Sequence, residues 1–414
     1  MKRTHPLPVA AATFRGIART SPRVPIGLPR RRFLARAGAA AVAAISSAPF
    51  LGAAASATLR AAIIGQTGGG DYGHGYDRIL SEIEGVEVVA VADPDSVGRE
   101  QAIARSGARR GYGDFREMLA RERPDLVSIA FRHPRSHTAV ALAAIEAGAH
   151  LFIEKPLTET LPEADRVVAA AKQKGTHTVV AHNRRYGADF QKVRALLKEG
   201  FLGRVREAHF HGKQDHRAGG EDLLVLGTHD FDLMRWLFGD PQWCSATVLV
   251  GGRHASRADA RDGREPIRVM GDTVRAQFGF AENVAATWES VSAKDAWNQP
   301  PGPREHWSFE ILGTRRVLAY QSGVGFAFLD SPYLLHPAND LKWQPLPTPA
   351  GETVPAHHTH MGRDLVHGVR TGESALCSAQ DGAWAIEMVT AVYQAHLNQR
   401  RVSFPLADRT DPLA

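Results

Sequence analysis

The stretch HLFIEKPLTET, residues 150–160, decides how the rest of the chain is interpreted. Its apolar residues 151–153 predict a short buried strand. The strand must stop at Glu154-Lys155-Pro156, because proline donates no hydrogen bond to a sheet ladder and keeps the residue before it extended. Ligands of open α/β sheets bind outside the carboxyl ends of the strands. Lys155 is therefore a candidate catalytic amine, although a loop lysine beside a turn proline has the same tripeptide.

The segment upstream, from Leu59 to Asp93, indicates a dinucleotide-binding β-α-β unit. LRAAIIG predicts a first strand, QTGGGDYGHG a glycine-rich turn, YDRILSEI a helix and VEVVAVADPD a second strand. Glycines let the backbone approach a pyrophosphate, a helix N-terminus stabilises its charge, and an acid after the second strand accepts hydrogen bonds from the adenine ribose. The expected cofactor contacts are Gly65, Thr67, Gly68, Gly70 and Asp93, with Thr67 standing where the usual motif has its second glycine.

The alternation of strands and helices continues to residue 181 and predicts a six-stranded parallel sheet. The fold class is therefore α/β: a signal peptide at 1–57, a Rossmann domain at 58–181, and an α+β domain at 182–414 with a large open mixed sheet. In the second domain we expect β-rich segments at 205–211, 245–250, 273–280, 284–289 and 306–312. Two late helices, near 360–369 and 380–396, are expected to pack back on the first domain.

Charge is unevenly distributed along the chain. Residues 1–57 hold nine Lys and Arg and no acid, whereas the remainder carries 41 basic and 44 acidic residues. The overall basicity therefore does not indicate nucleic-acid binding. Arg30-Arg31-Arg32, a short alanine-rich apolar segment and Ala55-Ser56-Ala57 resemble a twin-arginine export signal, which predicts a periplasmic protein. The apolar segment is too short for a stable membrane anchor.

Three later stretches resemble the Gfo/Idh/MocA oxidoreductases: DLVSIAFRHPRSHTAVALAAIEAGAHLFIEKPLTET, HNRRYGADFQKVRALLKEGFLGRVREAHF and GTHDFDLMRWLFGDP. The resemblance implies that Lys155 lies beside the nicotinamide and the substrate hydroxyl, with Glu154 also at the cofactor. It places His133-Pro134 near the nicotinamide and Arg185-Tyr186 at the start of the second domain, near the substrate. It also implies an open sheet whose face covers the nicotinamide, and a homo-oligomer formed through that sheet.

His229 is the second catalytic candidate, and its surroundings depart from the family pattern. The family has Asp four residues before this histidine, where this chain has Val225. On one continuous helix Asp222 would lie roughly 10.5 Å from His229 along the axis, too far to replace that carboxylate. Three alternatives follow: Lys155 and His229 suffice as the proton-transfer pair, Glu221 and Asp222 act from a rearranged loop, or ordinary alcohol oxidation is not the reaction.

Other candidates carry less information. Adjacent histidines at His357, His358 and His360 lack the spacing of zinc ligands, and we expect no metal. Cys244 and Cys377 have the character of small core residues. Aromatic and polar residues with sugar-binding or core character occur together at Trp288, Lys294, Asp295, Trp297 and Asn298, and Trp297 is a candidate substrate contact.

The predicted function is NAD(H)-dependent hydride transfer at a hydroxyl of a sugar, glycoside or cyclitol. Asp93 favours NAD over NADP, because a carboxylate would repel a 2′-phosphate. One alternative is an NAD-dependent glycoside hydrolase that oxidises a sugar transiently and eliminates the aglycone. The other is a sugar- or cofactor-binding protein without catalysis.

Overall fold

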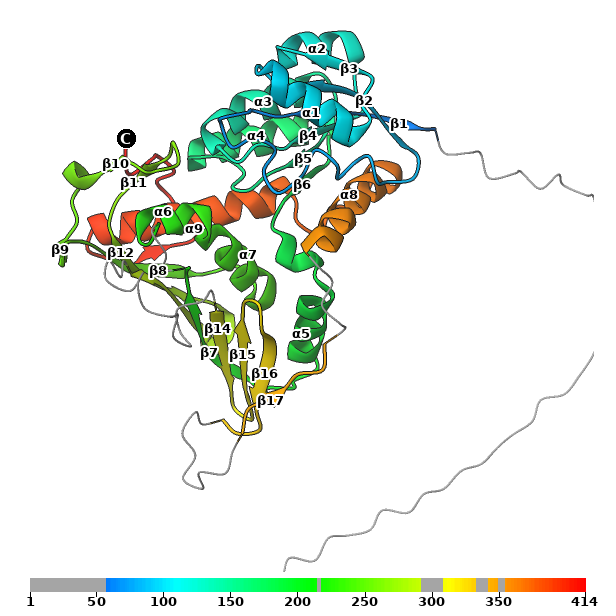
Figure 1. The fold of residues 1–414 in the computed structure, drawn as a ribbon. Helices are drawn as coiled ribbons and strands as arrows, with labels where there is room; N and C mark the ends of the chain where they lie inside the picture. The colour runs from blue at the N-terminus through cyan, green and yellow to red at the C-terminus, as the bar shows by residue number, and fades with distance from the viewer. Residues whose placement is uncertain (1–56, 214–216, 292–307, 333–341, 349–353) are drawn as a thin grey trace, which may run out of the picture. The chain divides into compact units, whose positions relative to one another are not determined.

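The computed structural model describes residues 57–213, 217–291, 308–332, 342–348 and 354–414 (Figure 1). The predicted export signal and the candidates Lys294, Asp295, Trp297 and Asn298 lie outside the described residues. Among the helices of the described part, none combines the length and the apolar character needed to cross a bilayer.

The first sheet contains six parallel strands in the order β3-β2-β1-β4-β5-β6. The strands are β1 Leu59–Ile64, β2 Val86–Ala92, β3 Arg110–Tyr112, β4 Leu126–Ile129, β5 His150–Ile153 and β6 Thr178–Val180. They connect through α1 Ser96–Ser106, α2 Phe115–Glu122, α3 His137–Glu146 and α4 Leu161–Lys174. The strands are short and apolar because a parallel sheet is buried on both faces. The strand order reverses between β1 and β4, which makes their carboxyl ends the ligand-binding switch point, and the predicted Rossmann sheet is confirmed.

The predicted helix between β1 and β2 is wrong. Residues 66–85 form successive turns, in which Arg78 N–H donates to the Gly75 carbonyl and Ser81 N–H to the Arg78 carbonyl, each over 3.2 Å. Gly73 and Gly75 hold positive φ at the point where the helix would begin, which interrupts α-helical geometry. The apolar residues of the segment are nevertheless buried: Tyr76, Ile79, Leu80 and Ile83. Their spacing identified the buried side chains but not the backbone conformation.

The second sheet has ten strands in the order β17-β16-β15-β14-β7-β13-β12-β8-β18, with β9 paired to β8. The strands are β7 Val205–His211, β8 Trp243–Val250, β9 Arg253–His254, β12 Thr273–Gly279, β13 Ala285–Val291, β14 Ser308–Gly313, β15 Val317–Gln321, β16 Gly325–Leu329, β17 Gln344–Pro345 and β18 Val402–Ser403. β7 and β13 are parallel and the other pairs are antiparallel, so the expected large mixed sheet is confirmed. A separate two-stranded ribbon pairs β10 Arg261–Asp262 with β11 Arg268–Val269.

Five further helices accompany this sheet among the described residues: α5 Ala188–Lys198, α6 Gly220–Val225, α7 Gly227–Phe238, α8 Val354–Thr371 and α9 Ala379–Leu397. α9 packs against β8 of the second sheet and against α4 and β6 of the first domain, and α8 contacts β5 and β6. The late helices therefore pack back on the first domain, as predicted (Figure 1).

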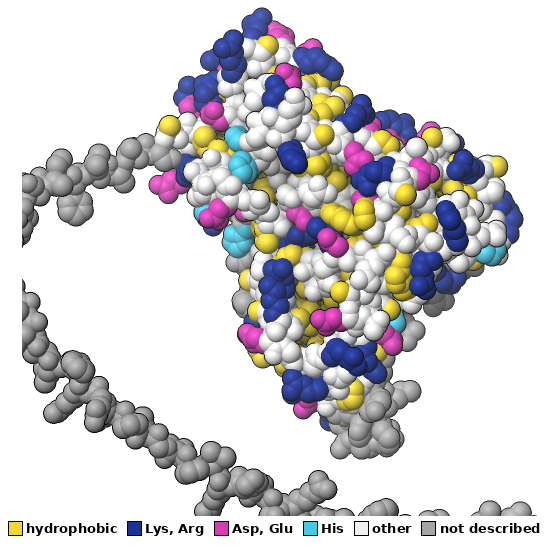
Figure 2. Space-filling model, turned by 180° about the vertical axis from the view of Figure 1, so that it is seen from behind, with side chains coloured by type: hydrophobic (Ala, Val, Ile, Leu, Met, Phe, Trp, Pro, Cys, Tyr) yellow, Lys and Arg dark blue, Asp and Glu magenta, His cyan; other side chains and the backbone are white. Residues whose placement is uncertain are grey.

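The two faces of the second sheet differ in polarity. On β12 and β13, Val274, Phe278 and Trp288 are fully buried, whereas the alternating Arg275 and Glu289 belong to the other face. Trp288 also donates its indole N–H to Asp230 over 2.9 Å, so the structure favours the core interpretation of this tryptophan over a sugar contact. On the surface visible in Figure 2, basic and acidic side chains are interspersed, and no broad single-sign field of the kind that binds nucleic acid covers that face.

Candidate active site at the end of the first sheet

Lys155 stands at the carboxyl end of β5, where the sequence places it. Its side chain is only 7% exposed, and its Nζ donates a hydrogen bond to the Val225 carbonyl over 3.1 Å. It lines a cavity of about 230 Å³ whose wall also carries His229. Val225, the position that lacks the family's carboxylate, thus contacts Lys155 through its main chain. A buried ammonium can donate in this geometry to a carbonyl or to a substrate oxygen.

His229 lies in the first turn of α7 and lines the same cavity. Its side chain is 7% exposed, and the edge of its ring meets the ring of His182 at a centroid distance of 5.5 Å. Burial, reinforced by the charge of Lys155, holds the pKa of His229 well below its usual value of 6.5. The imidazole is therefore neutral near pH 7, the form that can accept a proton.

The single helix assumed for Asp222 and His229 is wrong. The chain breaks at Leu226 into α6 and α7, because φ and ψ there, −113° and −38°, depart from helical values. Asp222 accepts a hydrogen bond from the Ser290 hydroxyl over 2.7 Å, and Glu221 accepts from the backbone N–H groups of Arg264 and Glu265. Neither acid lines the cavity that holds Lys155. The rearranged-loop alternative and the assignment of Asp222 as a substrate contact therefore find no support in this geometry.

Glu154 lies beneath the same cavity. It is fully buried, and its carboxylate lies 2.6 Å from His74 Nδ1. Burial alone would raise the pKa of Glu154, but the charge of Lys155 and the hydrogen bond of His74 outweigh it, and the net pKa is lowered. An ionised Glu154 therefore balances the buried ammonium of its neighbour and orients His74 at the cavity wall.

A second cavity, of about 300 Å³, opens at the carboxyl ends of β1, β2 and β4. Gly65, Asp93 and Phe131 are among its lining residues. An acid beside apolar walls at the switch point fits the ribose and adenine of a dinucleotide. Asp93 already accepts hydrogen bonds from the N–H and the hydroxyl of Thr67, over 3.1 and 2.8 Å, and is fully buried. Thr67 therefore orients the carboxylate.

The glycines of the loop have different surroundings. A Cβ on Gly65 would overlap the Tyr72 ring, and one on Gly70, at φ +93°, would lie 2.6 Å from the Arg132 backbone nitrogen. Gly68, at φ +76°, has no atom within 4 Å of the same position. Gly70 thus allows the loop to lie directly on the Arg132-His133 segment. The helix N-terminus expected to face a pyrophosphate is not formed in residues 66–85.

The predicted pair His133-Pro134 follows β4 at the start of a short 3₁₀ turn, in contact with this loop. Burial lowers the pKa of His133, and the charge of Glu265 opposes that effect. The pair therefore lies between the glycine loop and the acid Glu265, which lines the Lys155 cavity. The position of this pair near a nicotinamide stays a prediction.

Arg185 and Tyr186, predicted near the substrate, are placed elsewhere. The Arg185 guanidinium donates to both oxygens of Asp232, over 2.8 and 2.6 Å, and the Tyr186 hydroxyl donates to Asp364 over 2.7 Å. Both are buried, and neither lines the Lys155 cavity. These side chains join the second domain to the late helices, because buried donors must find fixed acceptors.

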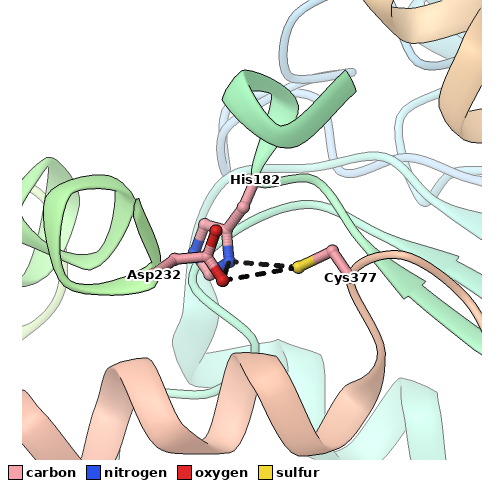
Figure 3. Close-up of side chains that lie close together, drawn as sticks. All are labelled: His182, Asp232 and Cys377. Atoms are coloured by element: carbon pink, nitrogen blue, oxygen red, sulfur yellow. Dashed lines mark hydrogen bonds and ion pairs between the residues drawn. The ribbon is translucent and has the colours of Figure 1, made fainter. Parts of the chain in front are cut away.

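Asp232 belongs to a buried cluster with His182 and Cys377, whose side chains point toward one another (Figure 3). The donor atoms are separated by 3.5 Å (His182–Asp232), 3.6 Å (His182–Cys377) and 3.7 Å (Cys377–Asp232). Such spacing suits a metal, but Arg185 already pairs with both carboxylate oxygens. The arrangement is that of a charge-paired core cluster, which agrees with the prediction that Cys377 and the equally buried Cys244 are core residues.

His358 and His360, which follow one another closely in the sequence, contact other residues of the fold. The ring of His358 contacts Tyr76 at a centroid distance of 4.7 Å, and His360 Nδ1 lies 3.3 Å from the Tyr186 carbonyl. The side chain of His357 lies outside the described residues.

Sequence reasoning missed several residues that the fold brings to the Lys155 cavity. They come from five separate segments of the chain: His74, Arg132, Asn183, Lys213 with Arg217, and Glu265. No spacing rule connects these positions. Only the proximity of Arg132 to the expected His133-Pro134 loop could have identified one of them.

Residues 59–182 match the model of the oxidoreductase family Gfo/Idh/MocA, NAD-binding Rossmann fold, and residues 190–319 match the Gfo/Idh/MocA C-terminal domain. D-apiose dehydrogenase of Paraburkholderia graminis is 36% identical over 184 residues, 42% of this chain and 48% of that protein. Inositol 2-dehydrogenase of Acidothermus cellulolyticus is 32% identical over 224 residues, 52% of this chain and 63% of that protein. The chain thus spans about half the length of the first relative and less than two thirds of the second.

Solved structures share the fold over most of the chain. A levoglucosan dehydrogenase in complex with NADH and levoglucosan has a TM-score of 0.66, with 84% of this chain and 99% of that chain covered. Its sequence identity is 20%, so this likeness concerns the fold alone.

Proposed function

Because the chain belongs to the Gfo/Idh/MocA oxidoreductase family, we propose that it transfers hydride between NAD and a hydroxyl-bearing carbon of a sugar, glycoside or cyclitol. One observation carries the proposal. Lys155, at the end of β5, and a neutral His229, at the start of α7, are both buried and line one cavity beside the Rossmann sheet.

Lys155 and His229 act on the same substrate hydroxyl in different ways. The Lys155 ammonium donates to the hydroxyl oxygen and stabilises negative charge as the proton leaves. The neutral imidazole of His229 accepts that proton, directly or through water. NAD, held by the Asp93 cavity and the glycine loop, supplies the hydride acceptor when bound. Burial of both groups excludes bulk water and strengthens their electrostatic effect on the oxygen.

The test is Lys155→Ala, assayed by NADH absorbance with sugars and cyclitols. We expect turnover to fall about 10²-fold or more while NAD binding persists, as for a positioned acid–base group. Equal turnover of the unaltered protein and the Lys155→Ala variant would contradict the proposal. Glycosides with a chromogenic aglycone belong in the same panel, because aglycone release would identify oxidative glycoside cleavage as the net reaction.

We further propose that residues 1–57 direct twin-arginine export to the periplasm and that NAD stays bound to the protein through turnover. The support is the paired arginines before an apolar segment, together with the absence of a free NAD pool expected in that compartment. Replacing Arg30 and Arg31 by Lys should keep the precursor in the cytoplasm. Release of NAD from the denatured, dialysed protein would support retention, and activity that returns only with added NAD would contradict it.

The open polar face of the second sheet supports a further proposal, that copies of the chain associate through this face. The face is concave and carries charged side chains that include His211, Arg275 and Glu310. Light scattering of the purified protein, repeated with Arg275→Glu, tests this. A monomer at micromolar concentration would exclude it.

A further inference from the structure

The wall of the Lys155 cavity carries a carboxylate to which the proposed mechanism gives no role. Among the described lining residues, Glu265 is the one acid, and its side chain is partly buried. In the described part of the chain, no side chain and no backbone N–H pairs with this carboxylate, although its charge acts on His133. Both oxygens of Glu265 are therefore acceptors for a molecule that enters the cavity.

The backbone of Glu265 is held in place from the second domain. Glu221 on α6 is only 3% exposed and accepts hydrogen bonds from the N–H groups of Arg264 and Glu265, over 3.1 and 3.2 Å. The turn between β10 and β11 also closes on itself, because the Gly263 N–H donates to the Ile267 carbonyl over 2.8 Å. The Ile267 side chain is fully buried. The tip of this ribbon is therefore a fixed part of the cavity wall.

The base of the same ribbon is attached to the first domain. Glu159, which follows β5, accepts a hydrogen bond from the Arg268 N–H over 2.8 Å and pairs with the Arg135 guanidinium over 3.2 Å. Arg135 pairs in turn with Asp262 on β10 over 3.3 Å. Lys155 and Glu159 belong to one segment after β5, so the contacts that place the ribbon also determine where its tip lies relative to Lys155.

We propose that Glu265 binds the substrate: its carboxylate accepts hydrogen bonds from hydroxyl groups beside the one that reacts, and Glu221 positions it for this contact. The inference rests on the proposed function and adds a specificity-determining residue to it. A carboxylate has two acceptor oxygens and no donor, which matches a pair of neighbouring hydroxyl groups on a sugar or cyclitol. The cavity of about 230 Å³ is small for a ligand site and has room for one sugar ring, so a ring whose hydroxyl meets Lys155 also lies against Glu265.

This carboxylate reaches the cavity from another part of the chain than the family pattern predicts. At Val225 the main-chain carbonyl, rather than a carboxylate, contacts Lys155. Glu265 brings an acid to the same cavity from the ribbon, through the contacts of that ribbon with Glu159 and Glu221. The site thus contains a carboxylate although the segment before His229 does not supply it. His229 keeps the proton-accepting role, and Glu265 orients the ring.

The size of the effect follows from the charge of the acceptor. A hydrogen bond to a charged group stabilises a complex by about 10- to 100-fold. Glu265→Gln keeps the length of the side chain and one acceptor oxygen but removes the charge. We expect kcat/KM to fall by about 10- to 100-fold, chiefly through a higher KM, while the affinity for NAD stays unchanged. A monodeoxy analogue that lacks the contacted hydroxyl should be affected less by the same substitution, because that hydrogen bond is already missing.

The experiment uses the NAD-loaded full chain and measures NADH formation and, separately, sugar binding by calorimetry. The probes are D-glucose, D-galactose, D-xylose and myo-inositol, followed by the monodeoxy analogues of the probe with the highest kcat/KM or, without turnover, the tightest binding. Glu265→Gln is compared with Glu100→Gln, which changes an exposed glutamate on α1 and should leave every value unchanged. Glu221→Gln should raise KM about tenfold for the parent sugar and less for the same analogue, a difference that a merely structural role would not produce.

Each outcome decides the inference. A loss with the parent sugar in Glu265→Gln that is smaller with at least one monodeoxy analogue supports it. No loss, or an equal loss with the parent sugar and every analogue, overturns it and leaves the proposed oxidoreductase function standing. Absence of NADH with every probe contradicts the oxidoreductase function instead, and calorimetry then decides alone. Weaker binding of the tightest probe to Glu265→Gln supports the inference in that case, whereas unchanged or undetectable binding overturns it.

Discussion

Gly70 offers the sharpest test of how the glycine loop is built, because Gly68 provides a matched control two residues away. Both hold positive φ, +93° and +76°. Alanine at either position should therefore cost about 1–2 kcal/mol for the left-handed backbone. Only at Gly70 would the new Cβ meet backbone atoms, 2.6 Å from the Arg132 nitrogen and 2.9 Å from the His133 nitrogen.

Backbone nitrogens cannot rotate away, so the 132–133 segment has to shift. Such overpacking costs about 1–3 kcal/mol. We expect Gly70→Ala to lower the free energy of unfolding by about 2–5 kcal/mol and Gly68→Ala by only about 1–2 kcal/mol. Urea denaturation followed by fluorescence measures both, and NAD titration should show weaker binding for Gly70→Ala because its loop and His133 move together. Equal destabilisation by the two variants would refute the close approach of the loop to this segment.

Three further predictions concern single groups. Asp93→Ala should reduce the preference for NAD over NADP, since it removes both a ribose acceptor and a like-charge repulsion; an unchanged ratio of the two dissociation constants would place the ribose elsewhere. Burial opposes ionisation of Asp232, but the charge of Arg185 outweighs it and lowers the pKa of Asp232 to about 2. The ionised carboxylate therefore contributes about 2 kcal/mol to the free energy of unfolding above pH 4, and this contribution is lost as the pH falls toward 2. Urea midpoints across that range should show this loss, and Asp232→Asn should abolish it. Because burial keeps the pKa of His229 far below 6.5, kcat/KM should show no histidine limb between pH 8 and 6; a limb near 6.5 that disappears in His229→Asn would contradict the assigned neutral base.

The amino-acid sequence by itself determined the first sheet and the position of Lys155. Strands buried on both faces require continuous apolar runs, and Pro156 ends the run at a defined residue, so both signals are local. The same locality explains the agreement for β7, whose predicted bounds, 205–211, coincide with the observed ones. Cys244 and Cys377 are also buried, as the sequence predicts, and neither has a partner cysteine within reach.

Tertiary structure alone decided the rest of the site. The apolar spacing of residues 76–83 is helical, yet glycines at positive φ and packing against α8 leave turns there. Arg185 and Tyr186 look like site residues in sequence but pair with Asp232 and Asp364, more than forty positions away. The cations of the Lys155 cavity come from loops that no periodicity connects. Contacts between distant segments depend on how whole elements pack, and a pattern within one segment carries no information about the charges that another segment brings beside it.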